Sequence, residues 1–410
     1  MSNIVISTHW TDGDVIPFIR IGKALKERGH RVTLLTHCCY EQEALKAGLE
    51  FTAWDTPEQY SSLVRDMGNH SGSATELDKI QDFRDKYESL DVRLNEFEKI
   101  SRHCRQKDTV ILAKNRSSIA ALMASEKFQC PIVLFFMNPS EMGSILAFHE
   151  LFKDRLREEA NEMRKHVGLP PVNSWLEWQL SPKIQLALWP EWFSPEAEEW
   201  PVKVKTVGFP VQSQKSKTAY NIPKDIEEIL REDPAPILIT GGTSRQIRPD
   251  FYPKAIEACG ILGKKTILVT RYKELLPETL PSNVIWFRHV PLDDILPYMG
   301  AVIHHGGIGT VSGAVYAALP QLALAYYVDR PLNARRIKKL GLGEYLPPSQ
   351  WEPVLIAGVL EKLLEEPYKK KCVDFLRKIP DDNAIDTVCG IAETISGNSE
   401  YAVSCNATNR

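Results

Sequence analysis

Short apolar runs alternate with helical patterns along the first half of the chain. Residues 4–6 are β-branched, and the apolar residues between Val15 and Leu25 recur every three or four positions, as in an amphipathic helix. Further runs of strand length lie at residues 32–36, 109–113 and 131–137. Such apolar strands are typical of a parallel sheet covered by helices on both faces, so this half predicts a doubly wound α/β domain.

A second alternation follows a polar linker. Residues 212–218 (QSQKSKT) contain nothing to bury and predict a domain boundary. Strands are then expected at residues 236–240, 266–270, 284–287, 301–304 and 321–326, with helices between them. We therefore expect an N-terminal domain at 1–211, a second domain at 219–375, and a C-terminal segment at 376–410. The apolar positions that predict an amphipathic helix in this last segment are Ala384, Ile385, Val388, Ile391 and Ile395.

Two stretches have less regular patterns. Residues 56–105 are polar and charged with scattered apolar side chains, consistent with a helical excursion. Residues 170–201 hold five tryptophans among several prolines. We expect these rings to pack an irregular connection against the sheet rather than to bind a ligand.

Length and charge exclude several classes of protein. A chain of 410 residues exceeds the roughly 250–300 residues at which a single core stops growing, which favours two domains. Fifty Lys and Arg residues against 53 Asp and Glu give a net charge of -3, so the basic field that nucleic acids require is missing. Apolar runs such as 132–137 fall far short of the roughly 20 residues that cross a bilayer.

The N-terminus and the cysteines indicate the compartment. The first ten residues form a strand pattern without the basic and apolar regions of a signal peptide, which favours a cytoplasmic location. Eight cysteines without CxxC or Cys/His metal spacing are expected to be free thiols.

The most informative stretch is residues 301–310 (AVIHHGGIGT), where a predicted strand leads into two histidines, a glycine-rich turn and a helix. Unpaired amides and the positive end of the dipole at a helix N-terminus bind anions, and glycines let a phosphate approach the backbone. The stretch therefore predicts a phosphate cradle. It matches neither GxxxxGK[ST] nor GxGxxG, and glycine-rich turns of this kind also occur without a ligand.

The next strand-to-helix turn, residues 326–333 (YYVDRPLN), brings acidic, basic and amide groups to the same edge of the sheet. The carboxylate of Asp329 is a good acceptor for sugar hydroxyls. An Asp just before Pro331 is also ordinary helix-start chemistry, so both interpretations stay open at this point.

Taken together, these motifs resemble the nucleotide-sugar signature of family 1 glycosyltransferases. The matching segments are HHGGIGT at 304–310, DRPLNARR at 329–336 and GLG at 341–343, with GDVIPF at 13–18, RGH at 28–30, tryptophan- and proline-containing segments between 189 and 210, and TGGTS at 240–244. The resemblance is to the bacterial branch with rhamnolipid rhamnosyltransferases, sterol glucosyltransferases and antibiotic glycosyltransferases. It implies the GT-B fold, two facing doubly wound Rossmann-like domains with an inter-domain cleft, and a C-terminal helix that crosses back to the N-terminal domain.

The resemblance also implies donor-binding residues. The nucleobase would meet His289 and the backbone of Val290, which leaves uracil and thymine equally open. Asp329 would bind sugar hydroxyls. The residues that would hold the diphosphate are Thr243, Ser244, His304, His305, Gly306, Gly307, Gly309 and Thr310.

Arg330 departs from the family, which normally has Gln at this position. A guanidinium has donors but no acceptor and always carries charge, so it would favour an anionic or differently hydroxylated sugar. Alternatively, Arg330 turns outward to solvent and the sugar is a neutral hexose.

Asp14 occupies the place of the catalytic base between the first strand and first helix. With an ordinary pKa of about 3.9 it is a weak base that accepts the proton late in the transfer. Asp12 and Asp14 also spell Asp-x-Asp, a metal motif of a different glycosyltransferase fold, and we expect no metal here. In purely structural terms, Asp12 is a turn residue and Asp14 a helix N-cap.

Acceptor recognition is expected from the first domain. Its loops offer the candidates Asn115, Met137, Asn138, Met142 and Phe148, whose apolar members suit a hydrophobic acceptor and are equally suited to the core.

These features predict an inverting, metal-independent enzyme that moves a hexose from a UDP- or dTDP-sugar to a hydroxyl of a hydrophobic small molecule or lipid. It needs no cofactor beyond the nucleotide-sugar co-substrate, and peripheral membrane contact stays possible. The alternatives are a non-hydrolysing nucleotide-sugar epimerase and a catalytically silent nucleotide-sugar-binding helper protein, for which Arg330 is the one supporting feature.

Overall fold

The computed structural model describes residues 1–69, 77–104, 109–197, 200–211, 222, 224–230, 235–327, 329–380 and 383–403. The chain divides into two compact units. Unit 1 comprises residues 1–66, 73–210 and 382–410, and unit 2 comprises residues 67–72 and 211–381. The predicted linker at 212–218 lies outside the described residues.

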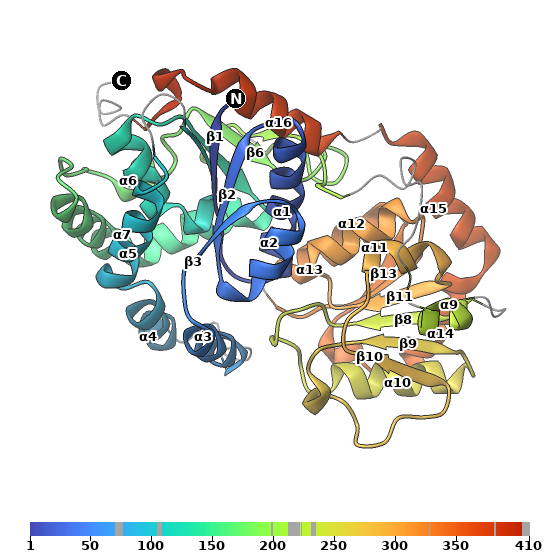
Figure 1. Cartoon of the computed structure of the whole chain (residues 1–410). Helices are drawn as coiled ribbons and strands as arrows, with labels where there is room; N and C mark the ends of the chain where they lie inside the picture. Colours follow the sequence, from blue (N-terminus) through green and yellow to red (C-terminus); the bar gives the residue numbers. More distant parts are fainter. Residues whose placement is uncertain are drawn as a thin grey trace. The chain divides into compact units, whose positions relative to one another are not determined.

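Unit 1 is built on a seven-stranded parallel sheet in the order β3-β2-β1-β4-β5-β6-β7 (Figure 1). Its strands are β1 (Asn3–Ser7), β2 (Arg31–Thr36), β3 (Glu50–Ala53), β4 (Thr109–Lys114), β5 (Ile132–Phe136), β6 (Ile184–Ala187) and β7 (Lys205–Thr206). The strand order reverses between β1 and β4, which are paired in register from Asn3 opposite Thr109 to Ser7 opposite Ala113. Ligands of doubly wound sheets bind at the carboxyl ends of the strands at such a reversal.

Helices connect the strands of unit 1. They are α1 (Asp12–Glu27), α2 (Glu41–Lys46), α3 (Pro57–Asn69), α4 (Leu77–Tyr87), α5 (Leu90–Ser101), α6 (Ile119–Phe128), α7 (Ser140–His166), α8 (Trp175–Gln179) and α16 (Ala384–Ile395), with short 3-10 turns η1 (Cys38–Tyr40), η3 (Asn115–Ser117) and η8 (Ser399–Tyr401). Helix α7 is kinked at Phe152, which has φ −130° and ψ 19°. The last residues of α3 fall in unit 2.

The C-terminal helix α16 completes the core of unit 1. Its buried residues Val388, Ala392 and Ile395 belong to the same apolar cluster as Phe18 of α1 and Ile6 of β1. Helix α16 packs against α1, and the two lie together in Figure 1. The spacing of apolar residues that predicts this helix therefore corresponds to the face that it buries.

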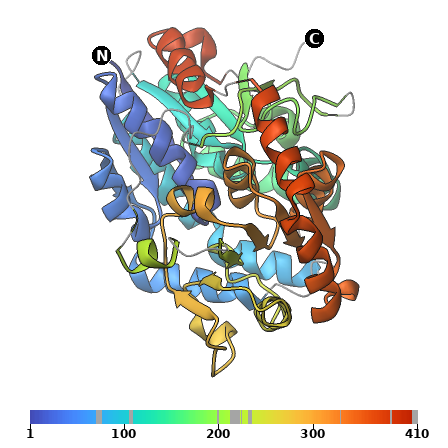
Figure 2. The same ribbon diagram turned by 90° about the vertical axis from the view of Figure 1, so that its right-hand side faces the viewer.

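Unit 2 contains a six-stranded parallel sheet in the order β10-β9-β8-β11-β12-β13, drawn in yellow to orange in Figures 1 and 2. The strands are β8 (Ile237–Thr240), β9 (Thr266–Val269), β10 (Val284–Phe287), β11 (Ala301–His304), β12 (Gln321–Leu324) and β13 (Gly343–Leu346). This sheet reverses its order between β8 and β11.

Two apolar clusters hold most helices of unit 2, though not α13 (Arg330–Lys339), to its sheet. The helices are α9 (Lys224–Leu230), α10 (Phe251–Ile261), α11 (Leu292–Ile295), α12 (Ile308–Tyr316), α13 (Arg330–Lys339), α14 (Pro353–Leu364) and α15 (Glu366–Lys378), with 3-10 turns η5 (Lys273–Leu275), η6 (Leu296–Tyr298) and η7 (Pro348–Gln350). The fully buried Trp351 lies in one cluster and donates a hydrogen bond to the carbonyl of Leu346.

The prediction of two doubly wound α/β domains is confirmed, and most predicted strands lie within one or two residues of the observed ones. The tryptophan-rich stretch packs as expected, with Trp175, Trp178 and Trp189 buried. The seven described cysteines are free.

Candidate functional site

The loops that follow β8 and β11 form the centre of the candidate donor site. These are the two strands at which the order of the unit 2 sheet reverses. Thr243 and Ser244 follow β8, and the turn at residues 305–307 follows β11. Residues that are far apart in the sequence are therefore brought to one edge of the sheet, where ligands of such folds bind.

The glycine-rich turn leads directly into helix α12. Gly307 precedes the helix, and its carbonyl accepts the first intrahelical hydrogen bond from Val311. The amides of Ile308, Gly309 and Thr310 lie in the first helical turn, where no earlier helical carbonyl can pair with them. Gly309 is exposed, so this turn can act as an anion site.

The ring of His305 packs against Gly307 of this turn and against Gly242 of the loop after β8. A Cβ atom on Gly242 would stand 2.5 Å from Cε1 of His305, and a Cβ atom on Gly307 would also overlap the ring. Gly242 has φ +73°, a conformation that favours glycine. Burial and the positive charge of Arg330 keep the pKa of His305 well below its usual value, so the ring packs as a neutral group.

His304 does not face a ligand. The predicted direct contact with a diphosphate is therefore corrected, because its side chain is fully buried and its Nδ1 accepts a hydrogen bond of 3.0 Å from the amide of Gly306. Burial lowers the pKa of His304 to about 4, only weakly opposed by the side chain of Gln321. His304 shapes the turn as a neutral ring.

The start of α13 contacts the glycine-rich turn at residues 305–307. Asn333 donates hydrogen bonds to the carbonyl of Gly306 at 3.1 Å and to Oδ2 of Asp329 at 2.8 Å. Gly306 has φ +89°, and an added Cβ would lie 2.8 Å from the carbonyl oxygen of Arg330. Asn333 thus fixes the Asp329 carboxylate relative to the glycine-rich turn.

Arg330 belongs to the fold of this site. The expectation that Arg330 turns outward to solvent is wrong, because the residue is buried, and selection of an anionic sugar by Arg330 stays a prediction. The residue is 6% exposed, and its Nη1 donates to the carbonyl of Gln246 in the loop after β8. Burial lowers the pKa of Arg330, while Asp329 and three tyrosines act in the opposite direction.

The predicted nucleobase residues follow β10. The side chain of His289 is exposed, and Val290 is buried among the apolar residues of unit 2. The exposed ring of His289 is compatible with stacking on a nucleobase, and the buried position of Val290 holds its backbone for the contact that the family resemblance implies.

In unit 1 the predicted base Asp14 has a partner that the sequence does not predict. Asp14 lies in the first turn of α1, where Thr11 is the N-cap, so it is not a capping residue. Its Oδ1 pairs with Nζ of Lys114, the last residue of β4. Lys114 is 4% exposed and Asp14 is 23% exposed, so the carboxylate is reachable while the ammonium is enclosed. The pair sits at the reversal of the unit 1 sheet.

The neighbouring Asp12 is engaged differently. Its Oδ1 accepts a hydrogen bond of 2.8 Å from the hydroxyl of Tyr40. Among the described residues, no group of three or more His, Cys, Asp and Glu side chains is arranged to hold a metal ion.

The predicted acceptor residues separate into two groups. Asn115, Met137 and Met142 are buried, and the backbone carbonyl of Asn115 accepts hydrogen bonds from Gln179 and Ser118. Asn138 and Phe148 are half-buried. Asn138 Oδ1 accepts a hydrogen bond from the amide of Ser140 at the start of α7.

Sequence reasoning missed an aromatic group in the loop before α1, the helix that carries Asp14. Trp10, between β1 and α1, has φ 86°, which is unusual for a bulky residue and often marks a functional site. Its ring stacks on Phe83 with a centroid distance of 5.9 Å, and the guanidinium of Arg116 lies 6.0 Å from it. Arg84 lies 5.2 Å from the ring of Phe148 in the same way. No local pattern in the sequence signals these pairings.

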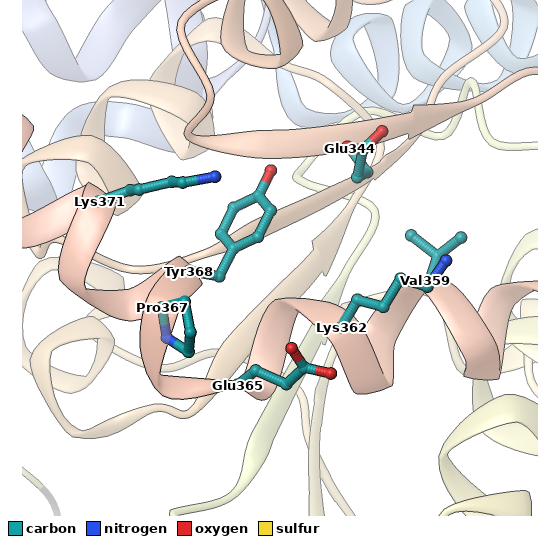
Figure 3. A pocket seen from close by; sticks show the side chains of 7 residues that line it. All are labelled: Glu344, Val359, Lys362, Glu365, Pro367, Tyr368 and Lys371. Carbon is teal, nitrogen blue, oxygen red and sulfur yellow. The ribbon is translucent and has the colours of Figure 1, made fainter.

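A pocket of about 530 Å³ lies elsewhere in unit 2, between β13, α14 and α15 (Figure 3). Its lining consists of Glu344, Val359, Lys362, Glu365, Pro367, Tyr368 and Lys371. None of the residues predicted to bind donor or acceptor is among them.

Two family models match separate parts of the chain. Residues 4–139 match the glycosyltransferase family 28 N-terminal domain, and residues 261–386 match the erythromycin biosynthesis protein CIII-like C-terminal domain. In the part of the chain that the structure describes, no helix has the length and apolar character needed to cross a membrane.

Several curated proteins are similar along most of the chain. A sterol 3-beta-glucosyltransferase of Arabidopsis thaliana, UGT80A2, is 25% identical over 93% of this chain and 64% of its own length. A second sterol 3-beta-glucosyltransferase, from Pichia angusta, is matched over only 33% of its length, so the chain spans one to two thirds of these relatives. An O-mycaminosyltylonolide 6-deoxyallosyltransferase of Streptomyces fradiae is 24% identical over 82% of this chain and 84% of its own length.

Solved glycosyltransferases share the fold. The glycosyltransferase of kitacinnamycin has a TM-score of 0.72 at 16% identity and covers 96% of this chain and 98% of its own. VinC, solved in complex with dTDP, has a TM-score of 0.69 at 17% identity over 96% of this chain and 99% of its own. These structures show that the chain has the GT-B fold, and the two domain matches with the curated relatives support a glycosyltransferase that is similar to family 1.

Proposed function

We propose that the protein is an inverting glycosyltransferase that moves a hexose from a UDP- or dTDP-sugar to a hydroxyl of a hydrophobic small molecule or lipid. One observation carries the proposal. In each unit, groups that this reaction needs lie next to the strands that flank the reversal of the sheet. In unit 1 they are Lys114 at the end of β4 and Asp14 in the helix after β1, and in unit 2 they are the loops after β8 and β11.

Unit 2 would hold the donor. The first-turn amides of α12 suit the diphosphate, because preorganised donors stabilise the charge that develops on the leaving group. Thr243 and Ser244 would contribute from the loop after β8, with the carbonyl of Thr243 already held by the hydroxyl of Tyr272 at 3.0 Å. Asp329, oriented by Asn333, would accept hydrogen bonds from sugar hydroxyls.

Asp14 would act as the base. The acceptor hydroxyl gives its proton to the Asp14 carboxylate while its oxygen bonds to the anomeric carbon. The bond from that carbon to the diphosphate oxygen breaks, and its electron pair leaves with the diphosphate, so the configuration is inverted. The ion pair with Lys114 fixes the carboxylate in place.

The acceptor class is supported by the relatives and by unit 1. A sterol 3-beta-glucosyltransferase and an O-mycaminosyltylonolide 6-deoxyallosyltransferase are among the similar proteins. The strained Trp10, with Phe83 stacked on it, offers an aromatic surface at the loop that leads to Asp14. Aromatic rings suit the flat apolar skeleton of such acceptors.

The helper-protein alternative loses its main support. It rested on Arg330 in place of Gln, and the bond of Arg330 to the Gln246 carbonyl gives that side chain a role in the fold.

The test is a transfer assay with UDP- and dTDP-hexoses and a panel of sterols and macrolide aglycones, followed by chromatography and anomeric analysis of the product. Asp14→Asn should lose at least about 100-fold in kcat because the proton acceptor is removed. Asp12→Asn is the matched control in the same helical turn, and it should keep its activity. Full activity of the Asp14 variant would refute the assignment of the base.

A further inference from the structure

An exposed arginine, Arg116, lies near the candidate base of unit 1. It belongs to the 3-10 turn η3 and follows Lys114, the partner of Asp14, by two residues. Two residues of chain reach at most about 7 Å, so Arg116 starts from the same end of β4 as this pair. Its guanidinium carbon lies over the ring of Trp10, 6.0 Å from the centroid, in the loop between β1 and α1. Arg116 is therefore placed next to the loop that leads to Asp14.

The positive charge of Arg116 lacks an ion-pair partner in the part of the chain that the structure describes. Asp12, Asp14 and Glu141, carboxylates at the same edge of the sheet, are each engaged by another group. A guanidinium is always charged, so an exposed one without a partner is open to an anion from outside the chain. A single guanidinium balances one negative charge, so a carboxylate suits it better than a phosphate group with about two.

Arg116 differs from an ordinary surface arginine because an aromatic ring positions it. Trp10 has φ 86°, and its ring stacks on Phe83 with a centroid distance of 5.9 Å. A guanidinium over an aromatic ring keeps its N–H groups free, since these donors point outward in the plane of the group. Orientation in advance also lowers the entropy that binding costs. An apolar surface and an oriented cation therefore lie side by side at this loop.

We propose that Arg116 is a specificity-determining residue that selects acceptors carrying a carboxylate. The inference rests on the proposed function and narrows its acceptor to a hydrophobic hydroxy acid. The apolar skeleton of this acceptor lies against Trp10 and Phe83, and its carboxylate binds the guanidinium through two parallel hydrogen bonds. The acceptor hydroxyl is then free to reach Asp14, which Lys114 holds in place. Arg116 takes no proton and makes no covalent bond in the transfer.

The test measures transfer to acceptor pairs that differ in one negative charge, a hydroxylated steroid acid with its methyl ester and a hydroxy fatty acid with its methyl ester. For the wild-type chain, KM of the acid should be at least about tenfold lower than KM of the ester, because the ester loses a hydrogen bond between charged groups. Arg116→Gln should raise KM of the acid to that of the ester and leave kcat unchanged. Arg116→Lys keeps the charge without the planar donor fork, so it should keep part of the preference.

Arg102→Gln is the matched control. Arg102 is exposed at the end of α5, before β4 begins, whereas Arg116 follows the end of β4. The Arg102→Gln variant removes one positive charge from the same unit and should keep the wild-type preference for acids.

The outcomes are distinguishable. Equal KM values for acid and ester in the wild type, or an unchanged preference in Arg116→Gln, overturn this inference and leave the proposed function standing, because transfer itself is observed. Absence of transfer by the wild-type chain with every donor and acceptor overturns the proposed function, and this inference with it. Calorimetry with UDP and dTDP gives a separate check. Weaker nucleotide binding by Arg116→Gln would assign the guanidinium to the donor and refute its role toward the acceptor.

Discussion

Replacing Gly242 by alanine should break the contact that joins the two donor loops. The ring of His305 fills the space beside Gly242, and an added Cβ would lie 2.5 Å from Cε1 and 2.8 Å from Nε2 of that ring. Real Cβ atoms do not approach a ring so closely, so either the loop after β8 or the glycine-rich turn must move.

The magnitude has two parts. An L-residue in the left-handed conformation that Gly242 adopts costs about 1–2 kcal/mol. Insertion of a methyl group into a packed site costs about 1–3 kcal/mol more, because side chains and backbone must shift. The Gly242→Ala variant should therefore lose roughly 2–5 kcal/mol of local stability.

Gly263 provides the control, because it has φ +60° but nothing within 4 Å of an added Cβ. Gly263→Ala should show only the backbone cost of about 1–2 kcal/mol. Local stability is best measured by hydrogen exchange of the β8 and β11 amides, since a chain of two units need not unfold in one step. His305→Ala in the Gly242→Ala background should remove the steric part. Equal losses in the Gly242 and Gly263 variants would refute the proposed packing of His305 against Gly242.

Three further predictions concern charges. Lys114→Met removes the ion-pair partner of Asp14, so it should lower kcat by about tenfold or more without changing donor affinity. Steady-state kinetics measures kcat and calorimetry measures donor affinity. Weakened donor binding would contradict this role. Arg330→Gln should destabilise the loop after β8 by about 1.5–3 kcal/mol in hydrogen exchange, and unchanged exchange would contradict its role in the fold. A changed preference between neutral and uronic-acid donors in this variant would show that Arg330 also selects the donor sugar. The wild type should lose stability as pH rises from 4.5 to 8, because the Glu141 carboxyl, whose pKa is raised to about 7 on folding, binds more protons in the folded state over that range. The free energy of unfolding should fall by at most about 3 kcal/mol, and Glu141→Gln should remove this fall. Parallel curves of unfolding free energy against pH for the two proteins would contradict this.

The fold was largely predictable because its signals are local. Apolar strands of a doubly wound sheet and a glycine-rich strand-to-helix turn are continuous in the sequence, as at β8, β11 and α12. Strands β3, β6, β7 and β13 were not predicted, since they are short and carry fewer apolar residues in a continuous run. Helix α7 begins at Ser140, and its first turns carry the mixed composition of a loop, so its start was not predicted.

The partners of the site residues were less predictable, because they depend on tertiary contacts. Nothing in the sequence near Asp14 indicates Lys114, which is a hundred residues away and joins it only through the pairing of β1 with β4. Arg330 was interpreted from its chemistry alone, and its bond to Gln246 could not be foreseen without the sheet order. The signal that could have identified Lys114 is a lysine at the end of an otherwise apolar strand, since a buried ammonium needs an anionic partner.

The most direct test of the account is the response of isotope-labelled protein amides to UDP, dTDP and GDP in NMR titrations. The account predicts that UDP or dTDP shifts the amides of Ile308, Gly309 and Thr310 together with those of Thr243 and Ser244, and that GDP does so more weakly. Nucleotide shifts confined to the pocket lined by Glu344, Lys362 and Tyr368, or no shifts in the first turn of α12, would contradict the assignment of the donor site.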